Sequence, residues 1–538
     1  MIYAIRRALC RLRSDEGFTM LVVLGVMLVT SALLVAAFTG SGEDVTLSHR
    51  DTIEKQAYYA ALAGVQEYEY KLESNPDYWQ TCEEPAATVS ALTAGEADQR
   101  FEDKILVAST APSGTTKCTT SNPFESVIES KDPVANTFRI ESIGCAGAIE
   151  LTSCAGQPAS SVATRRLIAT FQVTGFLNYI YYTQFEDQDP QTYLAAEGRT
   201  PTEELEANAC SGKYRAEREK EEAAHHIECH NIYFGSNDAV NGPMHTNDTA
   251  NVCGGATFGR KGHEPLDVVE IDRGVNTSCG GGPATFYTAK GEPEKGQDLT
   301  PPESDASLNV YVEAANRFEG RTELELKGTT IQVTTLNSST KAKESKTIEW
   351  PKNGLIFVRS KGCNYEFQQE GTDTSQTYEE EANCGSVYVH GTYSKSLTIG
   401  AESYLIINGN ITPTGVTNGS APTGTTALGL IATDDVRIYH PCTFNKNGSE
   451  SLKDPWIYAA ILSTAHSFLV DNYACGAGLG ELNIYGAIAQ KYRGIVGILG
   501  GSGYDKDYIY DERLATEEPP YYLSPFKAGW KIVRLISP

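Results

Sequence analysis

Three histidines and a cysteine between positions 225 and 230 have side chains that can bind Zn²⁺. They are His225, His226, Cys229 and His230. The charge run just before them, from Lys213 to Glu222, is typical of a solvated helix or insert. Cys229 also has disulfide partners available elsewhere in the chain, and this favours a structural role. We therefore predict no metal site and no cofactor.

Three aspartates stand at the ends of short apolar runs in the C-terminal half: Asp434, Asp435 and Asp471. Paired carboxylates can carry out glycoside hydrolysis. Aspartate is also common in turns, where it accepts hydrogen bonds from nearby backbone amides. The glycine runs at 476–478 and 500–503 lack the strand–turn–helix context of a nucleotide-binding loop. We predict no catalytic residues and expect that the chain is not an enzyme.

The elements that would position these side chains begin with an apolar segment at residues 17–38. About 21 residues at a rise of 1.5 Å span about 30 Å, the thickness of a bilayer core. Four arginines precede the segment and an acidic remainder follows it. This order predicts a single-pass membrane protein with a cytoplasmic N-terminus and an extracytoplasmic ectodomain. The apolar run exceeds the 7–15 residues of a secretory signal, which argues against a removable signal peptide.

The residues Asp15-Glu16-Gly17-Phe18-Thr19 stand directly before and at the start of this run. A short charged leader, a glycine and Phe-Thr resemble the class III signal of type IV prepilins. The resemblance implies that a prepilin peptidase cuts after Gly17 and that the new terminal Phe18 is N-methylated. The apolar helix would then stay on the chain as an assembly element. A plain signal-anchor helix is the alternative.

The helical pattern continues beyond the apolar run. Apolar and small side chains recur at three- and four-residue steps from Ile53 onward, and Asn75-Pro76 ends the pattern, so we predict one helix over 18–72. Within it, QAYYAALAGV at 56–65 resembles the A-x-x-A-A-E-A-G-[LIV] stretch of PilX-type minor pilins. Major pilins carry glutamate at the fifth mature position, where this chain has Val22. The resemblance therefore implies a minor pilin and not a repeating major subunit.

Charge and cysteine content restrict the partners and the compartment. The chain has 538 residues and a formal net charge of −25, so we predict no nucleic-acid partner. Of 13 cysteines, Cys10 falls in the leader and the other twelve fall in the exported part, where disulfides form. Our hypothesis joins nearest neighbours in chain order. The pairs are Cys82–Cys118, Cys145–Cys154, Cys210–Cys229, Cys253–Cys279, Cys363–Cys384 and Cys442–Cys475.

Short apolar runs recur between residues 347 and 500, separated by Gly, Asn and Asp turns. Strands this short cannot bury a face alone, whereas stacked coils share a continuous core. The pattern favours a right-handed parallel β-helix, with a β-sandwich as the alternative. Three histidines next to these runs, His390, His440 and His466, are expected to be packed wall residues. The stretch 231–248 and the aromatic tail resemble parts of β-helical ectodomains that follow PilX-like N-termini in actinobacterial exported proteins.

The expected fold class is α+β and mainly β, with a long N-terminal transmembrane or pilin helix. The expected parts are a prepilin leader at 1–17, the helix at 18–72, a pilin-like α+β domain at 73–175, a β-rich connecting region with a polar insert at 176–345, the β-helix at 346–500 and a C-terminal cap at 501–538. Strands are expected at 137–145 and 165–173, where apolar and polar residues alternate.

Three functions fit these patterns. The first is a minor pilin of a type IV pilus or pseudopilus, processed by prepilin peptidase, with other pilins and the membrane as partners. The second is a membrane-anchored β-helical surface protein that binds a glycan or another surface ligand. The third is an exported glycan-active enzyme. The sequence favours the first, a non-enzymatic structural component at the cell surface.

Overall fold

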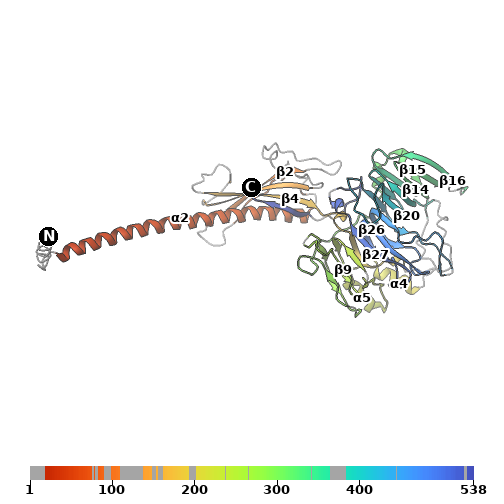
Figure 1. Ribbon diagram of the computed structural model, residues 1–538, viewed down its shortest axis with the longest axis horizontal. Coiled ribbons are helices and arrows are strands. Elements are labelled where there is room, and N and C mark those ends of the chain that lie inside the picture. The colour runs from red at the N-terminus through yellow and green to blue at the C-terminus, as the bar shows by residue number, and fades with distance from the viewer. Residues whose placement is uncertain are drawn as a thin grey trace, which may run out of the picture. The chain divides into compact units, whose positions relative to one another are not determined.

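The computed structural model describes residues 18–75, 78, 83–89, 99–108, 137–147, 153–154, 162–192, 201–236, 238–264, 266–280, 282–337, 339–340, 342–363, 383–443, 445–515, 517–525 and 530–538. The chain forms two compact units (Figure 1). The first, the helix–sheet unit, comprises residues 1–172 and 531–538. The second, the solenoid unit, comprises residues 173–530 and is inserted between the two segments of the first.

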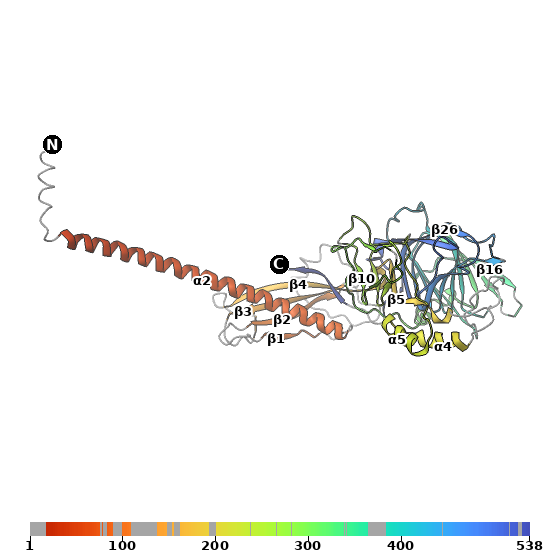
Figure 2. The same ribbon diagram turned by 90° about the horizontal axis from the view of Figure 1, so that it is seen from below.

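The helix–sheet unit contains one long helix and one five-stranded sheet. The helix is α2 (Phe18–Ser74). The sheet has the order β1-β2-β3-β4-β28, and neighbours among its first four strands are antiparallel. Its strands are β1 (Ala86–Val89), β2 (Gln99–Ala108), β3 (Thr137–Ala146), β4 (Ala163–Val173) and β28 (Trp530–Ile536). Figure 2 shows the second half of α2 lying across this sheet, while the first half continues past its edge.

The solenoid unit is built from parallel strands that stack in three columns. The first column contains β13 (Arg317–Glu319), β17 (Leu355–Arg359), β19 (Leu397–Ala401), β21 (Leu428–Ala432), the middle of β25 (Trp456–Val470), the end of β26 (Gly478–Arg493), β5 (Tyr181–Gln188), β7 (Met244–Thr246) and β10 (Val269–Ile271). The second contains β14 (Thr322–Gly328), β18 (Val387–Tyr393), β20 (Leu405–Pro413), β22 (Val436–Ile438) and the end of β25.

The third column shows how the interior is filled. It contains the ends of β14, β18 and β20, the start of β25 and the first half of β26, then β27 (Gly503–Tyr510), β6 (Ala239–Asn241), β9 (Thr257–Phe258) and β12 (Thr285–Phe286). Ile457, Ile484, Tyr508, Val240 and Phe258 follow one another in register and are all buried in the same core cluster. Each short strand therefore buries its inner side chains against the coils above and below it. This parallel stacking excludes the β-sandwich alternative, because sandwich sheets are antiparallel.

Smaller elements decorate the solenoid. They are α4 (Pro201–Cys210), α5 (Arg215–His225), α6 (Leu308–Tyr311), the 3₁₀ turns η2 (Phe176–Asn178), η3 (Pro190–Thr192), η4 (Ala314–Asn316) and η5 (Glu512–Ala515), the antiparallel extension β15 (Thr330–Leu336) and β16 (Lys343–Glu349), and the pairs β8 (Ala250–Asn251) with β11 (Val275–Asn276) and β23 (Cys442–Thr443) with β24 (Lys446–Asn447).

The order of the coils in the stack differs from their order in the chain. The early strand β5 pairs in parallel with the late strand β26, and β6 pairs in parallel with β27. The chain then crosses the outside of the first column between β12 and β13. Tyr182 donates to the backbone oxygen of Leu299 (2.6 Å), and the Asp305 amide donates to Thr433 (3.1 Å) along this crossover. The early segment, which we expected to be a connecting region, therefore supplies coils of the stack.

The C-terminal segment also differs from the expected cap. Its first strand, β27, lies within the stack between β26 and β6. Its last strand, β28, belongs to the antiparallel sheet of the helix–sheet unit, next to β4. The described chain therefore leaves that sheet after β4 and returns to it at β28.

The predicted fold class and membrane localisation require correction. The chain is mainly β, with 41% strand against 20% helix. In the part of the chain that the structure describes, no helix combines the length and the apolar character that a bilayer crossing demands. The prediction of a transmembrane helix with single-pass anchoring was wrong on this finding.

Candidate assembly interface

The first half of α2 presents apolar side chains to solvent. Met20 is 71% exposed, Leu24 53%, Leu28 72% and Leu33 64%. These positions do not share one face, because every described side chain from 22 to 35 is exposed. A helix that is apolar all round is normally buried on every side. This segment, residues 20–35, is called the apolar rod below.

The few polar side chains of the apolar rod are turned toward its own backbone. The Thr30 hydroxyl donates to the carbonyl oxygen of Val26 (2.8 Å), and the Ser31 hydroxyl donates to that of Met27 (2.6 Å). Such bonds to the preceding turn satisfy the hydroxyls without a partner from outside the helix. The rod therefore offers a neighbour its methyl and methylene surface and almost no hydrogen-bonding groups.

The second half of α2 begins with charged residues and ends against the sheet. Lys55 pairs with Asp51 (2.7 Å) on the exposed side of the helix, and Arg165 of β4 reaches Glu54 (2.6 Å). The side chains buried against the sheet are Ala57, Ala60, Ala61, Val65, Tyr68 and Leu72. The three alanines among them are small and let α2 approach the strands closely.

Two glycines set the contact between α2 and the sheet. A Cβ added at Gly144 of β3 would overlap the backbone oxygen of Ala57 and the backbone nitrogen of Ala61. A Cβ added at Gly64 of α2 would overlap the Ser142 hydroxyl and lie 2.5 Å from Asp103 Oδ1. The two backbones touch at Gly144, and sheet side chains reach the helix backbone at Gly64, only because neither glycine has a side chain.

An acidic side chain is buried at this contact. Asp103 of β2 is 3% exposed, and neither of its carboxylate oxygens has a hydrogen bond of ordinary geometry. Burial raises the pKa of Asp103 to about 7; the Ser142 hydroxyl opposes this rise and the charge of Glu67 adds to it. Burial likewise raises the pKa of Tyr78 to about 12, helped by its hydrogen bond to Glu83.

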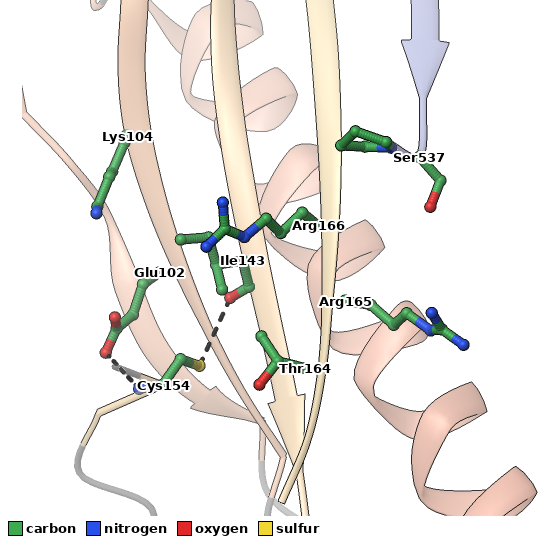
Figure 3. A pocket seen from close by; sticks show the side chains of 9 residues that line it. Glu102, Lys104, Ile143, Cys154, Thr164, Arg165, Arg166 and Ser537 are labelled. Carbon is green, nitrogen blue, oxygen red and sulfur yellow. Dashed lines mark hydrogen bonds between the residues drawn. The ribbon is translucent and has the colours of Figure 1, made fainter. Parts of the chain in front are cut away.

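The opposite face of the sheet carries a shallow polar groove (Figure 3). Arg166 of β4 extends over it and pairs with Glu141 (3.4 Å). At its edge, Glu102 accepts hydrogen bonds from Arg100 (3.1 Å) and from the Cys154 amide (3.1 Å), and the Cys145–Cys154 disulfide holds that segment to β3. Of the charged side chains that line the groove, Glu102, Arg165 and Arg166 each pair with a charged residue outside its lining.

The aspartates considered for catalysis lie in two separate groups. Asp434 and Asp435 follow β21, where His466 of β25 binds Asp189 (Nδ1 to Oδ2, 2.6 Å) and lies 3.9 Å from Asp434. Asp471 lies apart from them and binds Arg437 (Nε to Oδ1, 2.7 Å). Asp435 is 2% exposed and accepts a hydrogen bond from the Ser467 amide (2.9 Å). These bonds tie turns and strands together.

The charges around His466 counteract the effect of burial on its pKa. Burial alone lowers the pKa of His466, but the hydrogen bond and charge of Asp189, with the charges of Asp435 and Asp434, raise it to about 9. Burial raises the pKa of Asp435 to about 7, although the charge of His466 counteracts part of this rise. At neutral pH the imidazolium therefore links Asp189, which follows β5, to the turn after β21.

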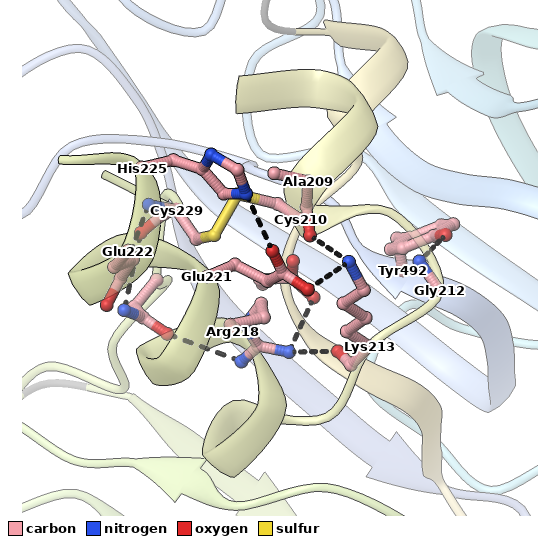
Figure 4. Close-up of a disulfide and its surroundings, with 12 residues drawn as sticks. Ala209, Cys210, Gly212, Lys213, Arg218, Glu221, Glu222, His225, Cys229 and Tyr492 are labelled. Atoms are coloured by element: carbon pink, nitrogen blue, oxygen red, sulfur yellow. Dashed lines mark hydrogen bonds and ion pairs between the residues drawn. A yellow bond between two sulfur atoms is a disulfide. The ribbon is translucent and has the colours of Figure 1, made fainter. Parts of the chain in front are cut away.

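The structure places the histidine–cysteine cluster around a disulfide (Figure 4). Cys229 is bonded to Cys210, and its amide donates to Glu222 (2.8 Å). His225 lies 3.3 Å from Glu221, which also binds Lys213 (2.8 Å). Among the described residues no group of histidine, cysteine and carboxylate side chains has the arrangement of a metal site.

The two other histidines that stand beside the apolar runs pack as wall residues. His440 is fully buried and lies between the backbone oxygen of Asp471 (3.0 Å) and Asn447 (3.2 Å), while His390 binds Asn408 (3.0 Å). Both positions fit the role expected from the apolar runs beside them.

Five disulfides join cysteines in the order that chain proximity suggests. They are Cys145–Cys154, Cys210–Cys229, Cys253–Cys279, Cys363–Cys384 and Cys442–Cys475. Cys82 and Cys118 lie outside the described residues. The five bonds indicate an oxidising, extracytoplasmic environment. Of the expected processing site, Gly17 also lies outside the described chain, and Phe18 is the first residue of α2.

Sequence reasoning did not single out Gly64, Gly144, Asp103 or Asp189. Gly64 lay within a small-residue stripe, and a glycine within a strand, as at Gly144, is a known sign of close backbone approach. Asp103 and Asp189 had no such signal, because each gains its partners from segments distant in the chain. Comparison of the chain with protein-family models, with curated proteins and with solved structures gives no match.

Proposed function

We propose that this chain is a non-enzymatic structural subunit of a type IV pilus-like filament, of the minor-pilin kind. In this proposal the apolar rod packs against the equivalent rods of other subunits. Prepilin peptidase prepares the subunit by cutting after Gly17 and methylating Phe18. The disulfide-bonded solenoid unit is then displayed on the outside of the filament.

The observation that carries the proposal is the all-round exposure of the apolar rod. A stripe on one face would fit a single neighbour, but side chains exposed on all faces require several neighbours around the helix. Burying a Leu or Val side chain stabilises an assembly by about 1.5–3 kcal/mol. A bundle of identical rods satisfies this requirement, and it resembles the helical core of a pilus.

The size of the solenoid unit favours low stoichiometry within such a filament. Residues 173–530 form this unit, and the rod that would enter the bundle is far shorter. Subunits packed side by side along a whole filament would bring these units into collision. A position at or near the tip avoids that crowding and agrees with the minor-pilin resemblance, in which Val22 replaces the glutamate of major pilins.

The proposal is tested with Leu28→Asp, which places a charge on the apolar rod where a neighbour would bury it. Leu266→Asp in the solenoid unit is the matched control, because Leu266 is 74% exposed and Leu28 is 72% exposed. We expect Leu28→Asp to reduce the amount of chain in sheared, pelleted surface filaments at least tenfold, and Leu266→Asp to leave it near wild type. Equal recovery of both variants would reject the proposal.

The N-terminus provides an independent measurement. Mass spectrometry of the mature chain from the filament fraction should find N-methylated Phe18 as its first residue. A mature chain that begins beyond the apolar rod would contradict the proposal, because the rod would have been lost before assembly.

A further inference from the structure

The contact between α2 and its sheet contains a carboxylate in an unfavourable place. Asp103 lies beneath Gly64, and the absence of a side chain there brings the helix backbone close to the carboxylate. Both carboxylate oxygens are buried without a hydrogen bond of ordinary geometry. A buried ionised carboxylate without such bonds costs several kcal/mol, whereas its neutral form costs far less.

The groups that face Asp103 do not neutralise it. Glu67 and Tyr68 face it from α2, and Ser142 faces it from β3. Tyr78, Glu83 and Glu84 lie nearby in the segment after the helix. The nearby cation, Lys71, pairs with Glu67 (3.6 Å) and lies 5.2 Å from the centre of the Tyr78 ring. In the described chain no ion pair includes Asp103.

We propose that docking of α2 onto its sheet is linked to protonation of Asp103. The neutral carboxyl group allows the close contact at Gly64 and Gly144, and ionisation weakens that contact. If α2 also carries the apolar rod into a filament, which rests on the proposed function above, the acidity of the surroundings regulates how firmly each subunit holds its rod.

The direction of the effect follows from the shift in acidity. The pKa of Asp103 is about 7 in the folded unit, where burial raises it from the ordinary value of 3.8. Stability from this group is therefore greatest at low pH and declines as pH rises from about 4 to about 7. Above pH 7 the carboxylate is ionised in both states, and the decline stops.

The measurement is amide hydrogen exchange in the full-length chain, dispersed so that no filament is present, over residues 57–72 of α2. After correction for intrinsic exchange rates, we expect protection of this segment to fall about 20-fold between pH 5.5 and pH 7.5. Asp103→Asn removes the ionisable group and should retain the higher protection at both pH values. Asp51→Asn is the control, because Asp51 lies on the exposed side of the same helix, with its side chain 63% exposed.

A second variant keeps the inference testable if the Asp103→Asn protein does not fold. Glu67→Gln removes an acidic neighbour whose charge raises the pKa of Asp103, so the loss of protection should be smaller and should end at lower pH than in wild type. If wild type and Asp103→Asn lose protection equally with pH, or if Glu67→Gln leaves the midpoint of a folded protein unchanged, the inference is rejected. Because the chain is dispersed in this experiment, its result is independent of whether Leu28→Asp prevents filament assembly.

Discussion

Two buried sites, one in each unit, hold charge in opposite ways. In the solenoid unit the two largest fully buried side chains are arginines, and each has an acidic partner: Arg493 binds Glu186 (2.9 Å), and Arg218 binds Asp248 (2.9 Å). In the helix–sheet unit, Asp103 is buried without a cation. A buried pair is strongly destabilised when one member is removed, whereas a lone buried acid is destabilising by its presence. The same kind of substitution should therefore have opposite signs in the two units.

The location of the pairs explains their role in the solenoid unit. Arg493 stands at the end of β26 and Glu186 lies in β5, so this ion pair joins the late and early parts of the chain where they stack. Arg218 of α5 reaches Asp187 (3.2 Å) as well as Asp248, and this fixes the helix to the coils. Paired charges at these places specify which coils meet, a task that apolar contacts alone perform less selectively.

The largest effect is expected for Arg493→Met. The variant keeps the volume of the side chain but leaves Glu186 buried without its cation, so we expect the solenoid unit to lose about 3–5 kcal/mol of unfolding free energy. Chemical denaturation followed by tyrosine fluorescence measures this loss. Arg359→Met is the control, because its pair with Glu319 is exposed and should contribute less than about 1 kcal/mol. Similar losses in both variants would show that pairing does not stabilise the buried sites.

Local features of this fold were predictable from the sequence. The strand expected at 137–145 corresponds to β3 (Thr137–Ala146), and the one expected at 165–173 lies within β4 (Ala163–Val173). The apolar runs at 355–358 and 387–389 lie in β17 and β18. These elements are predictable because alternation and apolar runs are properties of a few consecutive residues. Cysteines that close short loops are predictable for the same reason.

Long-range pairing was not predictable in the same way. The stacking of β5 on β26 and the return of β28 to the first sheet join residues more than 300 positions apart, and no local period records such contacts. The apolar run at the N-terminus was visible, yet apolar composition alone did not decide between a bilayer and a bundle of helices. No local sequence feature predicts the burial of Asp103, because that burial depends on the helix that crosses above it.

The second-largest effect concerns the pH dependence of the stability of the solenoid unit. The pKa of His466 is raised to about 9 in the folded solenoid unit, so its contribution is present below pH 6.5 and is lost as pH rises to about 9. The loss should be on the order of 3 kcal/mol. Unfolding measurements at pH 6 and pH 9 should show this decline in wild type and a much smaller one in His466→Gln. The decline attributed to Asp103 ends near pH 7, so a loss of stability between pH 7 and pH 9 distinguishes His466 from Asp103.

If His466→Gln shows the same pH dependence of unfolding as wild type, the imidazolium of His466 does not stabilise the solenoid unit. The control is His263→Gln, because His263 is half exposed and lies 3.7 Å from the exposed Glu512. It should leave the profile near wild type, since an exposed pair of this kind contributes little.

The smallest effect is expected from Gly144→Ala, which tests the glycine contact without changing any charge. The added methyl group would meet backbone atoms of Ala57 and Ala61, which cannot rotate away, so α2 must shift outward. We expect a loss of about 1–3 kcal/mol in the helix–sheet unit. Gly25→Ala is the matched control in the exposed part of α2, where a Cβ has no neighbour within 4 Å and alanine should stabilise the helix by about 0.5–1 kcal/mol. An outward shift would also admit water to Asp103 and lower its pKa, so Gly144→Ala should weaken the pH dependence of α2 protection. If protection of residues 57–72 falls and its pH dependence stays as steep as in wild type, burial by the close contact is not what raises the pKa of Asp103.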